Sequence, residues 1–113
     1  MATTYTVVPD GRDFRDAQQR VITYAALGNE SGDWFRYPEY PDKTITVYGT
    51  GTVTVEGSAD GVHAIALKDQ TGAAISLVVA GTSASAFILE NPVFMRVVNN
   101  NATGVIATVT CSK

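Results

Sequence analysis

The sequence is poor in the residues that metal sites and disulfide scaffolds use. Its 113 residues include one cysteine and one histidine. Cys111 has no second cysteine for an intramolecular disulfide, so we interpret it as a small, tolerated residue, with a disulfide between chains as the alternative. One histidine and one distant cysteine supply no zinc ligand cluster. The composition therefore excludes disulfide-stapled domains and zinc sites.

The sequence also lacks the residue pattern of a serine hydrolase. A serine nucleophile would need His63 as its base, but no G-x-S-x-G element occurs in the chain. Asp60 and Asp69 flank one expected strand and leave calcium as an alternative, because oxygen ligands constrain a sequence only loosely. Aspartates in such stretches are also typical of turns that bind nothing. We expect a protein that is not an enzyme and that holds no metal or cofactor.

Charged residues are scarce as well. They form 17% of the chain, which has a net charge of −3 and a pI near 4.9. Duplex DNA favours a basic stripe, and the scattered lysines and arginines make none, so we expect no nucleic-acid partner. The longest apolar runs fall well short of the ~18 residues of a membrane span, and MATTYTVVPDG lacks the pattern of a secretory leader. We expect a soluble protein made in a cytoplasm, without membrane contact.

Alternation of polar and apolar residues predicts β-structure over most of the chain. The stretch KTITVYGTGTVTVEGSADG, residues 43–61, alternates, pauses at Thr50-Gly51 and alternates again, which predicts a β-hairpin. The set predicted to face the core is Ile45, Val47, Val53 and Val55. The set predicted to face solvent or a partner is Thr44, Thr46, Tyr48, Thr52, Thr54 and Glu56.

The whole pattern predicts one all-β domain. About eight short strands, one of them Val21–Leu27, are separated by Gly, Asn and Asp turns, as in an antiparallel β-sandwich or jelly-roll-like barrel. We place this domain at residues 21–113 and an N-terminal extended arm, or lead-in, at residues 1–20. Within the lead-in, Asp13 could cap a short helix over residues 11–20, and an extended arm is equally compatible with the sequence.

The segment SGDWFRYPEYPDK, residues 31–43, is unusually rich in aromatic side chains. Two interpretations compete: the aromatic rings cover one open end of the sandwich, or they anchor a contact with a protein or a sugar. Under the second interpretation, the candidate partner-binding residues are Trp34, Phe35, Arg36, Tyr37, Tyr40 and, from the lead-in, Phe14.

Three stretches, ALGNESGD, TITVYGTGTVTVEGSADGVHAIALKDQTGAAI and PVFMRVV, resemble turn and strand motifs of small virion proteins of tailed bacteriophages. Proteins of this kind are commonly encoded near the major capsid protein. The likeness covers roughly residues 20 to 111. The family's usual tryptophan after the DG turn is Ala64 here, which leaves the role of that tryptophan in doubt.

The resemblance implies a capsid decoration, or cement, protein. It implies a β-sandwich or jelly roll without enzyme activity, made in the bacterial host cytoplasm and bound to the major capsid protein on the virion surface. It further implies a homo-oligomer, with a trimer favoured over a dimer, in which an N-terminal arm could add a strand to a neighbour.

Two alternatives remain open at this point. A head-completion or tail structural component would keep the phage context and change the location. The stretches EGSADG and PVFMRVV also resemble galactose-binding-like sandwiches, in which Trp34 or Tyr37 would stack on a sugar.

Overall fold

The computed structural model describes residues 4–8, 19–100 and 104–112, and these form seven strands and no helix. The strands are β1 (Thr6–Val8), β2 (Gln19–Leu27), β3 (Asp42–Ser58), β4 (Ile65–Ala66), β5 (Ser76–Ile88), β6 (Phe94–Asn99) and β7 (Val105–Ser112). All pairs between strands are antiparallel, so the predicted fold class is confirmed. Phe14 and residues 11–18 of the expected short helix lie outside the described residues, and the last two residues of that helix, Gln19 and Arg20, belong to β2.

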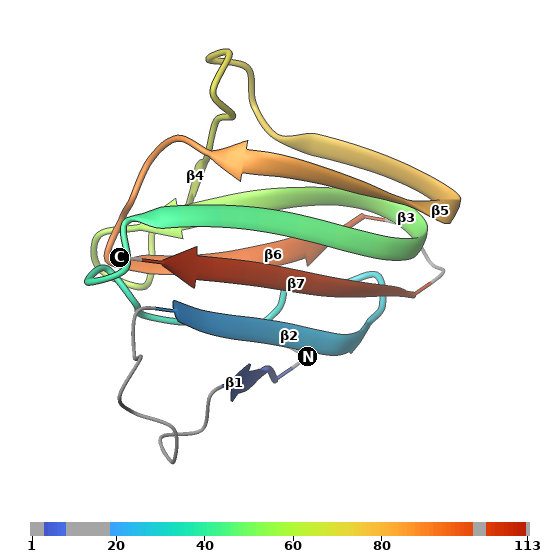
Figure 1. Ribbon diagram of the computed structural model, residues 1–113, viewed down its shortest axis with the longest axis horizontal. Helices are drawn as coiled ribbons and strands as arrows, with labels where there is room; N and C mark the ends of the chain where they lie inside the picture. Colours follow the sequence, from blue (N-terminus) through green and yellow to red (C-terminus); the bar gives the residue numbers. More distant parts are fainter. Residues whose placement is uncertain (1–3, 9–18, 101–103, 113) are drawn as a thin grey trace.

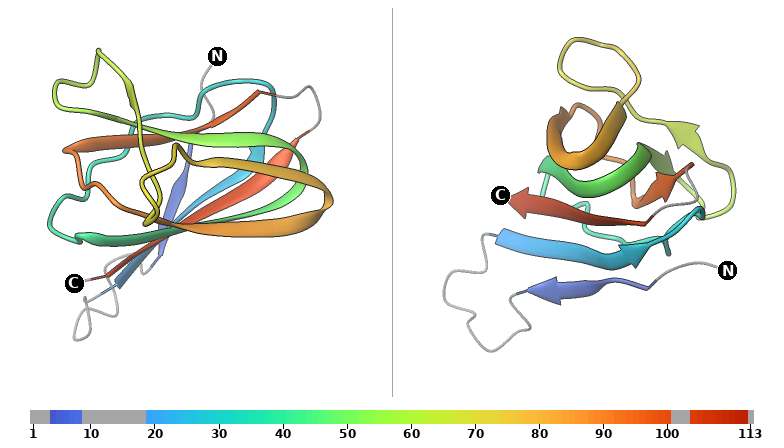
Figure 2. Two further views of the ribbon diagram at one scale, coloured as in Figure 1. Left: turned by 90° about the horizontal axis from the view of Figure 1, so that it is seen from above. Right: turned by 90° about the vertical axis from the view of Figure 1, so that its right-hand side faces the viewer.

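Two long strands, β3 and β5, connect the two layers of the sandwich. They pair with each other from Lys43 opposite Ile88 to Thr54 opposite Ser76, and both turn back part-way along their length (Figures 1 and 2). Layer A contains β1, β2, β7, the first half of β3 and the second half of β5. Layer B contains residues 31–35, β6, β4 and the remaining halves of β3 and β5.

The predicted hairpin at residues 43–61 is wrong, although the chain does turn back near its expected reversal (Figure 1). Residues 42–49 pair with β7 and β5, whereas residues 53–58 pair with β6, so the two halves of β3 lie in different layers. The alternation itself is confirmed, because the four residues predicted to face the core are all buried. Polar and apolar residues alternate in the same way in a hairpin and in a bent strand whose halves lie in opposite layers. The pattern alone therefore cannot distinguish the two structures.

Glycines make the corner possible. Gly49 has a φ of 119°, and a Cβ there would lie 2.9 Å from the carbonyl oxygen of Gly104. On the partner strand, Gly81 (φ 68°) is the extra residue of a β-bulge, because Gly49 pairs with Thr82 and Thr50 pairs with Ala80. Both strands therefore bend at one place without losing their pairing on either side.

The described part of the lead-in packs on the domain. Thr6–Val8 pairs with β2, with Thr6 opposite Thr23, and Tyr5 packs edge-on against Tyr24 at 5.8 Å between ring centroids. β2 begins at Gln19, two residues before the expected start of the domain. Exchange of this strand with a neighbour would therefore require β1 to leave its own sheet.

The core lies between the layers and is almost entirely apolar. Its members from layer A include Ile22, Tyr24, Ile45, Val47, Ala107 and Val109, and its members from layer B include Phe35, Val53, Val55, Met95 and Val97. Each aliphatic side chain of this size contributes roughly 1.5–3 kcal/mol when fully buried. This burial is what holds the two layers together.

One lysine is buried at an end of this core. Lys43 lies opposite Cys111, and its Nζ donates hydrogen bonds to the carbonyl oxygen of Tyr40 at 2.6 Å and to Oδ1 of Asn91. Burial lowers the pKa of Lys43 and raises the pKa of Cys111 to about 11. The Lys43 amine thus links β3 to the loops that contain Tyr40 and Asn91. The Cys111 thiol is protonated at neutral pH and is buried away from other chains.

The corner predicts a large effect of a single methyl group. Gly49→Ala should lower the free energy of unfolding by about 2–4 kcal/mol, because alanine is strained at this φ and its Cβ would press on the Gly104 oxygen. Gly72→Ala is the matched control, because Gly72 has a φ of 87° and open space around an added Cβ, and it should lose only about 1 kcal/mol. Urea denaturation measures both. Equal losses would show that the close approach to Gly104 is unimportant.

Burial of Cys111 predicts a loss of stability at high pH. The unfolded thiol titrates near 9.0, whereas the folded thiol titrates near 11, so the folded state binds this proton more tightly. The stabilising contribution is therefore complete below pH 9 and is lost as the pH rises through 11. Measured by urea unfolding, the stability of the wild type relative to Cys111→Ala should fall between pH 9 and 11. A difference that stays constant over this range would contradict the assignment.

Candidate interaction surfaces

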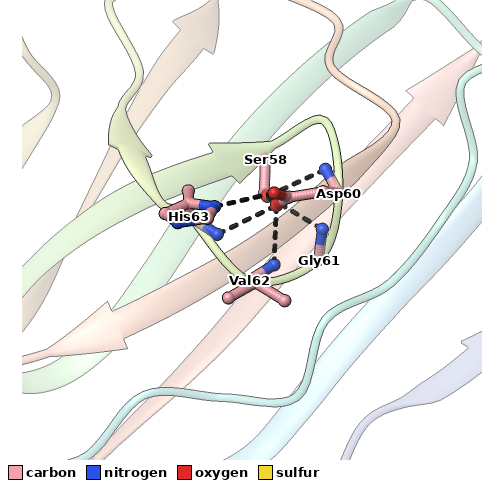
Figure 3. Close-up of polar contacts among 5 residues, drawn as sticks. All are labelled: Ser58, Asp60, Gly61, Val62 and His63. Carbon is pink, nitrogen blue, oxygen red and sulfur yellow. Dashed lines mark hydrogen bonds and ion pairs between the residues drawn. The ribbon is translucent and has the colours of Figure 1, made fainter.

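Ser58, Asp60 and His63 come together in one loop but lack the geometry of a hydrolase (Figure 3). Ser58 Oγ donates to Asp60 Oδ1 at 2.9 Å, and His63 Nδ1 lies 2.7 Å from Asp60 Oδ2. A serine nucleophile would instead bond to the histidine that removes its proton. The His63 side chain is 86% exposed. Ser58 and His63 therefore both contact the Asp60 carboxylate and do not contact each other as a nucleophile and its base would. The three residues stabilise a turn.

Backbone amides complete this turn. Asp60 Oδ1 accepts hydrogen bonds from the amides of Val62 and His63, and Ser58 Oγ accepts from the amides of Asp60 and Gly61. The side-chain hydrogen bond to His63, followed by the amides, holds the pKa of Asp60 well below its usual range. Asp69 makes a similar turn with Thr71. Nowhere in residues 4–8, 19–100 and 104–112 do three His, Cys, Asp or Glu side chains gather around a possible metal position.

The aromatic segment divides between the core and the surface. Phe35 and Tyr40 are buried, and Tyr37 packs against both at 6.4 and 6.2 Å between ring centroids. Phe35 also pairs with Met95 of β6 through two backbone hydrogen bonds. The prediction that Phe35 and Tyr40 bind a partner is therefore wrong, because both are already enclosed within their own chain. Covering the sandwich end is their role.

The other predicted residues of this segment lie on the outside of layer B. The Trp34 ring lies under the Arg96 guanidinium at 4.2 Å, and Arg96 Nη2 lies 2.7 Å from Glu56 Oε1. Phe94 packs edge-on against Trp34 at 6.5 Å and lies under Arg36 at 5.7 Å. We call these five residues the arginine–aromatic stack. Alternation in PVFMRVV could have placed Phe94 and Arg96 on one face beforehand.

The outside of layer A carries hydroxyl groups instead. Cross-strand pairing aligns Thr6, Thr23, Thr108, Thr46 and Ser85 in one row over all five strands. Neighbouring rows on the same face add Thr44, Thr110 and Ser83. These eight residues form what we call the hydroxyl face. Thr44 and Thr46 belong to the set that the alternation predicted to face solvent or a partner.

Apolar side chains border the hydroxyl face toward the corner. Tyr48 (51% exposed) and Ile106 (47% exposed) lie directly opposite each other on β3 and β7. They line a shallow hollow of about 290 Å³ together with Ala25, Ala26, Gly49, Gly104 and Val105. Phe87 lies next to Thr44 at the other end of the face.

Charged side chains are nearly absent from this outer surface of layer A. Among the described strand residues with outward-pointing side chains, only Asp42 is charged, and it lies at one end of β3. The core of a protein–protein interface is depleted of charge in the same way. Layer A therefore shares low charge with a contact surface, and sequence reasoning missed the hydroxyl row because it forms only after five distant segments pair.

Comparison with known proteins identifies the architecture. Neither a protein-family model nor a curated protein matches the sequence. The SPBc2 prophage-derived protein YomS is 10% identical, covers 84% of this chain and 93% of its own, and has a TM-score of 0.60. A cupin domain (bp2299) from Bordetella pertussis Tohama I is 16% identical, with 96% and 91% coverage and a TM-score of 0.51. The chain has a cupin-like jelly-roll fold.

At 10% and 16% sequence identity, these similarities show a shared fold and nothing about function. Oxalate oxidase is a weaker match, at 18% identity, 41% of its own chain and a TM-score of 0.43, and it carries no argument about activity. Function must therefore be argued from the surfaces of this chain.

The arginine–aromatic stack predicts a fluorescence change. Trp34 is the sole tryptophan, so Arg96→Ala should expose its ring and shift its emission to the red, while lowering the free energy of unfolding by about 1–2 kcal/mol. Arg36→Ala, which removes a guanidinium from Phe94 only, is the control and should leave the emission unchanged. Identical spectra for the two variants would show that Arg96 does not cover Trp34.

Proposed function

We propose that this chain is a capsid decoration protein of a tailed bacteriophage, a non-enzymatic cement that binds the major capsid protein on the head shell. The observation that carries the proposal is the hydroxyl face of layer A. It is a continuous, nearly uncharged sheet surface on a chain with a net charge of −3. Binding through it requires little desolvation of charge, and each hydroxyl can donate or accept a hydrogen bond.

The size of the hydroxyl face suits a contact that is repeated many times. Five strands about 4.8 Å apart and six residues about 3.3 Å apart cover on the order of 400 Å². A stable interface uses about 800 Å² from each partner, so one copy would bind weakly. A head shell offers many identical sites, and an oligomer that engages two of them gains ~10²–10⁴-fold in affinity. A homo-oligomer on the virion surface is therefore part of the proposal.

Two further observations favour a phage role. The turn and strand motifs resemble those of small virion proteins, and one solved structure with this fold is a prophage-derived protein. A sugar-binding role has less support, because the Arg96 guanidinium already occupies a face of the Trp34 ring that a sugar would need.

Co-sedimentation with expanded head shells of the encoding phage tests the proposal. The wild type should pellet with shells, and Thr108→Lys should weaken binding by at least about tenfold, because it places a charge at the centre of the hydroxyl face. Thr108→Glu should weaken binding as well. If charges of either sign weaken binding, the cause is the loss of an uncharged surface; attraction or repulsion by a charged shell would make the two variants differ. Arg36→Ala, on the opposite layer, is the control and should bind like the wild type.

Two outcomes would contradict the proposal at different levels. Loss of binding in Arg36→Ala but not in Thr108→Lys would move the shell contact to the arginine–aromatic stack. A wild-type chain that ignores head shells would exclude decoration. Cryo-electron microscopy of the virion would then show whether the protein occupies the head vertex or the tail instead.

A further inference from the structure

The second half of β5 is an open edge of layer A. Among the described residues β5 pairs with β3 alone, and it lies along the upper margin of the sheet in Figure 1. The loop at Lys68 and Asp69 reaches only the end of this strand, through Ile88 and Leu89. The backbone of Thr82–Phe87 therefore faces outward without a neighbouring strand.

This edge carries none of the residues that normally protect an edge strand. Its sequence, SLVVAGTSASAFI, contains no charged residue and no proline. Natural proteins guard exposed edges with lysine, proline, bulges or very short strands, because an open edge pairs readily with another chain. The bulge at Gly81 leaves residues 82–88 regular, and the opposite edge of layer A, β1, is only three residues long. An unguarded edge of this length indicates that another strand covers it.

We propose that a second copy of this chain covers it, with the two β5 strands pairing antiparallel about a two-fold axis perpendicular to the sheet. Identical strands paired in this way leave the same face of both sheets on one side. With Ser85 opposite Ser85, the row of hydroxyls from Thr6 to Ser85 continues into the partner and runs across both copies.

Chemistry favours a second copy over a different protein as the occupant. The chain has a net charge of −3, so two copies repel each other wherever their charged surfaces meet, and the uncharged edge avoids this repulsion. The two Ser85 hydroxyls, one from each copy, lie opposite each other at the axis and can donate and accept in turn. Backbone hydrogen bonds along the edge supply affinity, as in other cases of strand addition.

The pairing does not depend on shell binding, but it would strengthen it. Two hydroxyl faces side by side cover on the order of 800 Å², which reaches the area that a standard interface needs from one partner. A two-fold pair closes at two copies, so the edge geometry indicates a dimer where the family resemblance favours a trimer.

Light scattering of the full chain tests the pairing directly. The wild type should have twice the 12.0 kDa mass of one chain. Ser85→Lys should raise the dissociation constant at least about tenfold, because two like charges would face each other across the axis. Ser85→Glu should act in the same way, and an equimolar mixture of the two variants should restore the dimer. Circular dichroism confirms that each variant retains its β-structure.

The matched control is Thr6→Lys, which places the same charge at the other end of the same hydroxyl row. It should leave the dimer intact. A wild-type monomer, a trimer, or a dimer that resists Ser85→Lys would overturn the inference. A wild-type monomer would also remove the homo-oligomer from the decoration proposal, whereas binding of the chain to head shells is measured independently of the pairing, so each proposal can fail while the other stands.

Discussion

The pairing of β3 with β5 is the constraint on which the rest of the structure depends. The two strands form one ribbon that bends at Gly49 and Gly81 and runs through both layers. β7 and β6 pair with opposite ends of β3, β2 pairs with β7, and β1 pairs with β2. A side chain at Gly49 would push the corner against Gly104, so the closure of the sandwich depends on a close backbone approach that only glycine permits.

The same ribbon gives the molecule two unlike outer surfaces. Layer A presents aligned hydroxyls with little charge, whereas layer B presents Arg96, which Glu56 holds over Trp34, and Arg36 over Phe94. The first surface can adapt to a partner because hydroxyls both donate and accept, and the second is occupied by its own contacts. The proposed decoration role uses the first surface, and the proposed pairing of two copies would extend that surface.

The sequence predicted burial well where apolar residues alternate with polar ones along a strand. Apolar alternation correctly identified Ile45, Val47, Val53 and Val55 as core residues. For the aromatic segment two interpretations stayed open, a cover over the sandwich end or a partner contact, and the structure buries Phe35 and Tyr40 with Tyr37 packed against both. Burial of an aromatic ring and its use in an interface draw on the same apolar surface, so composition could not separate them.

The sequence by itself determined which side of its strand each residue faces, because the period of two is a property of the extended backbone. Only the tertiary structure decided which strands lie next to each other. Thr6, Thr23, Thr46, Ser85 and Thr108 form one row because four separate pairings bring them into register. Strand pairing depends on how all the apolar faces close around one core, and no local stretch of sequence contains that information.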